Sequence, residues 1–132
     1  MEFTWTELIN KISSLYMAGA SENQISSELA NCSLRDFGTV ERVETDDSPF
    51  IQVNMPRIEI PFGKKILIAD FLALNFTTLH DEHQFTYRKG AQIKFITKLI
   101  ESNGPFSGIG VSEDDEDKEI LIMVGTRDSE IA

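Results

Sequence analysis

The sequence is short of cysteine and of long apolar runs. Cys32 is the single cysteine among 132 residues, so no disulfide can form within the chain, which suits a reducing compartment. The longest apolar stretch, ILIADFLALNF, has about half the length that a membrane-spanning helix needs. The first residues, MEFTWTELIN, contain acids where a secretory signal needs Lys or Arg, and no apolar core follows. These absences predict a soluble, cytoplasmic protein.

Positive charge is also scarce. Lys and Arg number 12 against 22 Asp and Glu, which gives a formal charge of −10. Because phosphate backbones are bound through Lys and Arg, direct nucleic-acid binding is not expected. An acidic surface instead favours solubility and attracts basic partners.

The usual signatures of a catalytic centre are missing as well. No phosphate-binding Gly-rich loop, dinucleotide fingerprint or nucleophile elbow occurs, and nothing beside Cys32 would activate its thiol. The two histidines, His80 and His83, have a spacing that could hold a metal together with Asp81, but a third histidine is absent. The sequence therefore predicts a non-catalytic protein with no cofactor and no metal, His80 and His83 being the outside chance of a metal site.

An acidic run, SEDDEDKE at 112–119, precedes the apolar stretch ILIMV. Neither Asp114 nor Asp115 as first ligand puts a glycine at the sixth position, so the run does not fit a calcium loop. The favoured interpretation is a solvated loop whose like charges keep the following strand from aggregating. The alternative is a mimic of nucleic-acid charge, as in acidic phage-type inhibitors.

The chain begins with two amphipathic segments. Thr4 and Glu7 have the spacing of a capping box, and so do Ser21 and Gln24. Apolar residues recur at helical spacing after each pair, and Gly19 separates the two segments. Residues 1–30 are therefore predicted to form a helical arm.

From Asp36 onward the apolar period changes to two. Residues 36–62 are predicted to form strands, broken by an acidic turn at 45–49, and Pro56 and Pro61 favour an edge or a bulge. Residues 83–125 are predicted to be strands, with a hairpin that turns at Lys89–Gly90 and an acidic loop at 112–119. Residues 126–132 are expected to be a frayed tail.

Residues 63–79 are ambiguous between helix and strand. The stretch starts with β-branched residues, but its Ala and Leu content and its length favour a helix. That helix would be apolar nearly all round and would lie in the core or at a subunit interface. The predicted fold is one α+β domain, 1–132, with a helical arm, a twisted and mainly antiparallel sheet of five to seven strands, and one central apolar helix.

In this order the elements resemble the small acidic chaperones of type III secretion systems. The resemblance rests on WTELINKISSLY, on ILIADFLALNF where that family has its Leu-rich second helix, and on the hairpin HQFTYRKGAQIKFITKL, within residues 3–101. It implies a homodimer around the helix at 64–76, with Leu67, Phe71 and Leu74 in the interface, that holds an extended segment of a partner protein. The strands in 102–132 and a second short helix at 21–30 depart from that family.

The alternative fold is an OB-like β-barrel with N-terminal helices, in which 64–74 is a strand and the barrel offers a binding face. The partner-binding residues are predicted to be alternating apolar positions next to the prolines, where an extended peptide can add to an edge strand. These positions are Ile51, Val53, Met55, Ile58 and Ile60. Plain core packing is the equally weighted alternative for their side chains.

Overall fold

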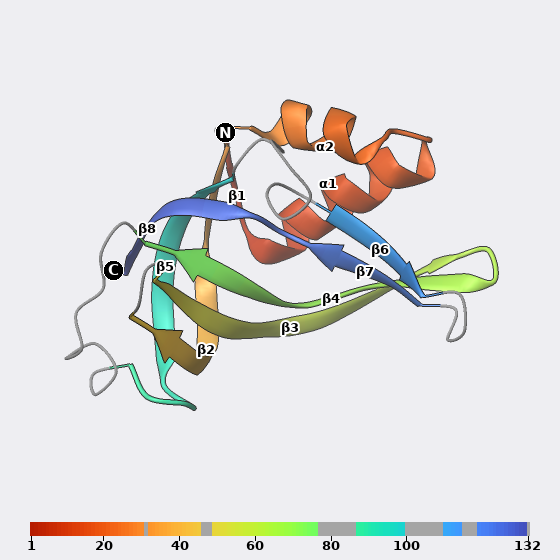
Figure 1. Cartoon of the computed structure of the whole chain (residues 1–132). Helices are drawn as coiled ribbons and strands as arrows, with labels where there is room; N and C mark the ends of the chain where they lie inside the picture. The colour runs from red at the N-terminus through yellow and green to blue at the C-terminus, as the bar shows by residue number, and fades with distance from the viewer. Residues whose placement is uncertain (31, 46–48, 77–86, 100–109, 115–118, 132) are drawn as a thin grey trace.

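Two N-terminal helices cover a curled, mixed sheet that forms a half-barrel (Figure 1). The structure is a computed structural model of the chain and describes residues 1–30, 32–45, 49–76, 87–99, 110–114 and 119–131. The elements are β1 (Glu2–Phe3), α1 (Trp5–Met17), α2 (Glu22–Leu29), β2 (Ser33–Glu44), β3 (Phe50–Phe62), β4 (Lys65–Asn75), β5 (Gln92–Leu99), β6 (Gly110–Asp114), β7 (Glu119–Met123) and β8 (Thr126–Ile131). The fold is mostly sheet with some helix.

The predicted helical arm is confirmed, and both helices begin with the expected capping box. The Thr4 hydroxyl accepts the Glu7 amide at 3.3 Å, and the Glu7 carboxylate accepts the Thr4 amide at 3.0 Å. Ser21 and Gln24 repeat this exchange at 3.2 and 2.8 Å. The hydrogen bonds from Thr4 hold the pKa of Glu7 below its ordinary value. The caps therefore satisfy helix-end amides that would otherwise have no partner.

The sheet has the strand order β6-β7-β4-β3-β2-β5-β8, and β1 pairs beside β2. Only β1–β2 and β4–β7 are parallel pairs among the described strands; the others are antiparallel, as predicted. None of the helices in the described part of the chain is long and apolar enough to cross a membrane.

The prediction of a central helix at 63–79 is wrong, because Lys65–Asn75 is the strand β4. β4 pairs with β3 on one side and with β7 on the other, and both of its faces carry apolar side chains: Leu67, Leu72 and Leu74 are buried in the core, whereas Ile66 and Phe71 are exposed. The register of the β3–β4 pair shifts between Asn54 and Ile58, so that Asp70 and Phe71 interrupt the alternation of β4. Leu67, Ile68 and Ala69 are buried in succession. Such a run looks helical in sequence, and pairing with the 13-residue β3 overrides the propensity of its Ala and Leu residues.

Three further expectations need correction. β3 is not an edge strand, since β2 and β4 flank it. The alternative of a bulge is confirmed for Pro56, whereas Pro61 pairs opposite Ile66. The expected frayed tail is strand β8, which pairs with β5 and buries a Thr97–Ser129 hydroxyl contact of 2.7 Å. The predicted acidic loop at 112–119 is partly strand, because β6 extends to Asp114. The strand expected around Phe85 lies mostly outside the described residues.

Trp5 fastens the helical arm to the bulge of β3. Its side chain is 1% exposed, and its indole N–H donates to the Pro56 carbonyl at 3.0 Å. Its backbone amide donates to the Asp36 carboxylate at 2.7 Å. Leu8, Ile9 and Ile12 follow it on the buried face of α1. The arm is thus part of the core and not an appendage.

The curl of the sheet is closed at Thr126. The Thr126 hydroxyl accepts the Asn75 amide at 3.0 Å and donates to the Ala73 carbonyl at 2.7 Å, both at the end of β4. The same residue pairs with Leu99 of β5. The chain from β7 into β8 therefore bridges β4 and β5, two strands that β3 and β2 separate along the rest of the sheet.

Gly38 allows β2 to pack closely on β3, so we expect Gly38→Ala to destabilise the fold. A Cβ at this position would lie 2.9 Å from the Met55 sulfur and 3.1 Å from the Val53 Cβ, and overpacking of this kind costs about 1–3 kcal/mol. Urea unfolding measures the loss. In a Met55→Ala background the loss should be smaller, because the sulfur is gone; an equal loss in both backgrounds would contradict this explanation.

Candidate functional site

The sequence-predicted metal ligands cannot be placed, because His80 and His83 lie outside the described residues. Among the residues that are described, no group of three or more His, Cys, Asp or Glu side chains is arranged to hold a metal ion. Cys32 is half-buried and lies beside the core. The side chains of 112–118, on which the charge-mimic interpretation depends, also lie outside the described residues.

The predicted partner-binding residues belong largely to the core. Ile51, Val53 and Met55 are buried, whereas Ile58 and Ile60 are half-buried against the same core. This burial agrees with the alternative of plain core packing. Of the residues predicted for a dimer interface, Leu67 and Leu74 are buried, whereas Phe71 is 38% exposed.

A different apolar surface lies on the outer face of β4 and β7. The register pairs Ile66 with Glu119 and Ile68 with Leu121, and neighbours paired in this way project from the same face of a sheet. Met123 follows Leu121 by two residues and lies on that face as well. Ile66, Leu121 and Met123 are 40%, 39% and 46% exposed, whereas Ile68 between them is buried.

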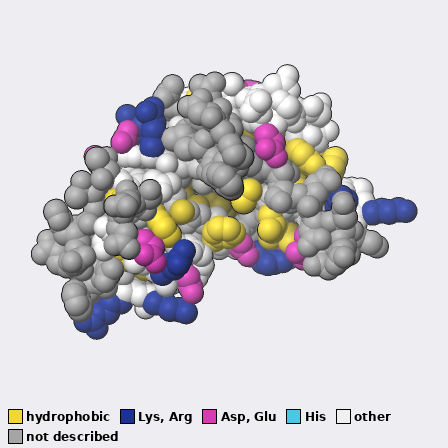
Figure 2. Space-filling view, viewed as in Figure 1, with side chains coloured by type: hydrophobic (Ala, Val, Ile, Leu, Met, Phe, Trp, Pro, Cys, Tyr) yellow, Lys and Arg dark blue, Asp and Glu magenta, His cyan; other side chains and the backbone are white. Residues whose placement is uncertain are grey.

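Phe71 extends this surface along β4, and we call the set Ile66, Ile68, Phe71, Leu121 and Met123 the β4–β7 patch. Figure 2 shows hydrophobic side chains gathered in the middle of one face of the molecule, over β4 and β7. Four of the eight exposed large hydrophobic residues in the described part of the chain belong to the patch. Single exposed apolar residues are ordinary, but a contiguous group marks a contact surface.

Charged residues of β3, β4 and β7 border the patch. The Arg57 guanidinium donates to Glu59 at 2.7 Å and to Asp70 at 3.4 Å. The hydrogen bond to Glu59, with smaller contributions from Asp70 and Glu119, raises the pKa of Arg57 above its ordinary value. The side chains of Arg57, Glu59 and Asp70 are 50%, 52% and 38% exposed, so a partner can reach them.

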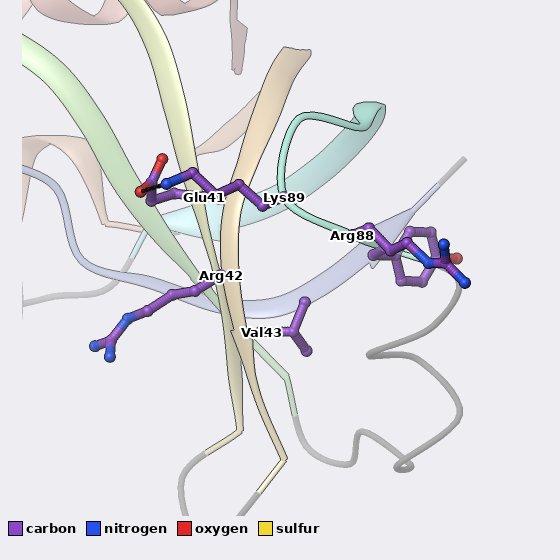
Figure 3. A pocket seen from close by; sticks show the side chains of 6 residues that line it. Glu41, Arg42, Val43, Arg88 and Lys89 are labelled. Carbon is purple, nitrogen blue, oxygen red and sulfur yellow. Dashed lines mark ion pairs between the residues drawn. The ribbon is translucent and has the colours of Figure 1, made fainter.

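Two hollows lie elsewhere on the sheet. One, of about 400 Å³, is lined by Phe37, Gly38, Thr39, Asn54, Met55, Pro56 and Gln92. The other, of about 340 Å³, is lined by Glu41, Arg42, Val43, Tyr87, Arg88 and Lys89. In Figure 3 the Lys89 side chain reaches over to Glu41, a contact of 3.1 Å, while Arg42 points away from Val43 and Arg88.

The charges of the second hollow are largely engaged within the protein. A hydrogen bond from Asn54 and the neighbouring Lys89 ammonium hold the pKa of Glu41 below its ordinary value. Arg42 contacts the Glu44 carboxylate at 3.5 Å and lies over the Phe50 ring at 5.1 Å. The arrangement is that of a paired surface and not of a catalytic acid–base couple, so the β4–β7 patch is the better candidate site.

No family model and no curated protein matches the chain. A solved structure similar to it comes from Klebsiella pneumoniae subsp. pneumoniae and is described as a "putative nucleic acid-binding lipoprotein". That protein is 9% identical, with a TM-score of 0.49, and the similarity covers 100% of this chain and 91% of the other. So distant a similarity leaves the function to be argued from the surface itself.

Sequence reasoning missed the β4–β7 patch because it assigned 63–79 to a helix. With that segment helical, Ile66 has no strand neighbour, and Leu121 and Met123 have no partner on their face. One signal was present in the sequence: EILIM has apolar residues at both odd and even positions, so both faces of the strand carry apolar side chains. A strand with one solvent-exposed face needs apolar residues on its other face only. A strand that is apolar on both faces is either covered on both or presents an apolar surface.

Proposed function

We propose that this protein is a non-catalytic binding module that holds a segment of a partner protein on the β4–β7 patch. The observation that carries the proposal is the contiguous exposure of Ile66, Leu121 and Met123 on adjacent strands. An apolar group of this kind, bordered by charges, is typical of a protein–protein contact surface. The proposed function is the one predicted from the sequence, but the proposed binding surface lies on β4 and β7 and not on β3.

For the fold class we propose the OB-like barrel in preference to the chaperone-like arrangement. The sheet order β7-β4-β3-β2-β5-β8 and the closing contacts at Thr126 support a barrel built from five long strand segments, with β7 and β8 as one of them. The parallel β4–β7 pair fits the same arrangement. OB-like barrels bind their ligands on the outer surface of the sheet, in keeping with the place of the patch.

The dimensions of the patch suit a short peptide segment. Neighbouring strands lie about 4.8 Å apart, and residues two apart on a strand lie about 7 Å apart. The apolar side chains of the patch are therefore spaced like those along one face of an extended peptide. A segment with two or three apolar side chains would cover Leu121, Met123 and Ile66 together. Burial of such side chains supplies the affinity, and the charged border sets the orientation.

We expect peptides selected from a random display library on the immobilised protein to depend on the patch. Leu121→Ser removes an exposed apolar side chain and should weaken the binding of a selected peptide by about tenfold, equivalent to about 1.4 kcal/mol. Fluorescence anisotropy of the labelled peptide measures the dissociation constant.

Phe37→Ser is the matched control, because Phe37 is 61% exposed and lies on β2, outside the patch. It should change the dissociation constant less than about twofold, as expected for a residue that the peptide does not touch. Selected peptides that respond to Phe37→Ser and not to Leu121→Ser would place the binding surface at the Phe37 hollow and would refute the proposal. Circular dichroism and urea unfolding establish that both variants are folded.

A further inference from the structure

The border of the β4–β7 patch is deficient in positive charge. Among the described residues, Arg57 contacts Glu59 at 2.7 Å and Asp70 at 3.4 Å and interacts electrostatically with Glu119. The three carboxylates outnumber the single positive charge of Arg57 in this group of described residues. This group of four side chains therefore carries a net negative charge next to exposed apolar side chains.

The rest of the molecule adds to this potential. The formal charge of the chain is −10, and Glu119, paired beside Ile66, is the last residue of the acidic run 112–119. A summed negative field of this kind raises the encounter rate with cationic partners and lowers it with anionic ones. The charges that border the patch and the net charge of the chain therefore both favour a cationic partner.

We propose that the partner segment is basic and amphipathic, with Lys or Arg side chains interspersed among apolar ones. The apolar side chains cover Ile66, Leu121 and Met123, while the cations approach Glu59, Asp70 and Glu119. This inference rests on the proposed function of the patch and specifies the chemistry of its ligand.

The two other occupants of such a surface fit its charges less well. A second copy of the chain would bring its own Glu59, Asp70 and Glu119 against the same border, and like charges facing each other destabilise an interface. A single-stranded nucleic acid would bring phosphates to the acidic border and to a chain of net charge −10. Both occupants are outcomes that the experiment below can report.

The test uses the full chain and three versions of one selected peptide: the basic form, a form with every Lys and Arg replaced by Gln, and a form with them replaced by Glu. Anisotropy should show the basic form binding at least about tenfold more tightly than the Gln form at low ionic strength. Raising the salt from about 50 to about 500 mM should remove most of that difference, because screening shortens the reach of exposed charges.

Glu59→Gln and Asp70→Asn should each weaken the binding of the basic form about threefold or more, since Arg57 is then left to repel the peptide. Glu130→Gln, an exposed carboxylate of β8, is the matched control and should have little effect.

The outcomes separate this inference from the proposal on which it rests. Equal binding of the basic and Gln forms, with loss on Leu121→Ser, would overturn the basic-partner inference and leave the binding module standing. Binding that is insensitive to Leu121→Ser would overturn both. Tighter binding of the Glu form, or of a labelled single-stranded oligonucleotide, would overturn the inference in favour of an anionic partner. A dimer seen by light scattering that Leu121→Ser dissociates would assign the surface to a second copy and would refute it as well.

Discussion

Trp5→Ala is expected to lower the free energy of unfolding by about 3–5 kcal/mol. The indole is 1% exposed, and its removal leaves a cavity where α1 begins, against the bulge of β3. The Pro56 carbonyl also loses its donor. Equilibrium unfolding in urea, followed by circular dichroism, measures the change.

Trp5→Phe separates the two contributions of the indole. It keeps much of the ring volume but not the N–H group, so the expected loss is smaller, about 1–2 kcal/mol. Thr4→Ala serves as a control for the helix start, because it removes the cap without touching the core and costs about 1 kcal/mol. A Trp5→Ala variant that loses no more than Thr4→Ala would show that the arm is not fastened to the sheet through Trp5.

Thr126→Val is expected to cost about 2–3 kcal/mol, because it removes a hydroxyl that serves two backbone groups and keeps the shape of the side chain. The Asn75 amide and the Ala73 carbonyl both lose this partner, at a residue that is 2% exposed. Buried backbone groups without a partner are costly. The effect measures how much the contacts of Thr126 contribute to the stability of the curled sheet.

Thr126→Ser is the matched control for the closing contacts. It keeps the hydroxyl and removes only a methyl group, so we expect a loss of about 1 kcal/mol or less. Amide hydrogen exchange adds a local readout: in Thr126→Val the amides of β8 and of the end of β4 should exchange faster than those of β2 and β3. Equal losses for Val and Ser would show that the Thr126 hydroxyl does not stabilise the junction of β4 and β8.

The helical arm could be predicted because its signals are local. Thr4 with Glu7, and Ser21 with Gln24, are pairs three residues apart, and they appear in the structure as hydrogen bonds of 2.8–3.3 Å. The apolar period after each cap then fixes which face is buried. The alternation in β5 is equally local, and Ile93, Phe95, Thr97 and Leu99 are buried as their spacing indicates.

β4 could not be assigned from its own residues, because its conformation is decided by neighbours distant in the sequence. Its partners are β3 and, through a parallel pairing that begins at Glu119, β7. Its outer face carries Ile66, Ile68 and Phe71 where a solvated strand has polar residues, so ILIADFLALN shows no period of two. The strand β8 was missed for a related reason: TRDSEI is polar, and its burial of Thr126 and Ser129 depends on partners in β4 and β5.

The prediction of the candidate site depended on the same assignment of 63–79 as helix or strand. The Ile51–Ile60 positions have an alternation typical of a strand with one apolar face, but that face turns to the core and not to a partner. The exposed apolar residues Ile66, Leu121 and Met123 become neighbours only when β4 and β7 pair. A surface formed by two strands more than forty residues apart in the sequence leaves no short motif to find.

The account is tested most directly by mapping where a selected peptide binds, through amide chemical shifts of the ¹⁵N-labelled protein during titration. We expect the largest shifts at Ile66–Phe71 of β4 and Glu119–Met123 of β7, with small shifts at Phe37, Thr39 and Gln92 around the hollow on β2. Shifts centred on that hollow, with β4 and β7 unchanged, would contradict the claim that the β4–β7 patch is the binding surface.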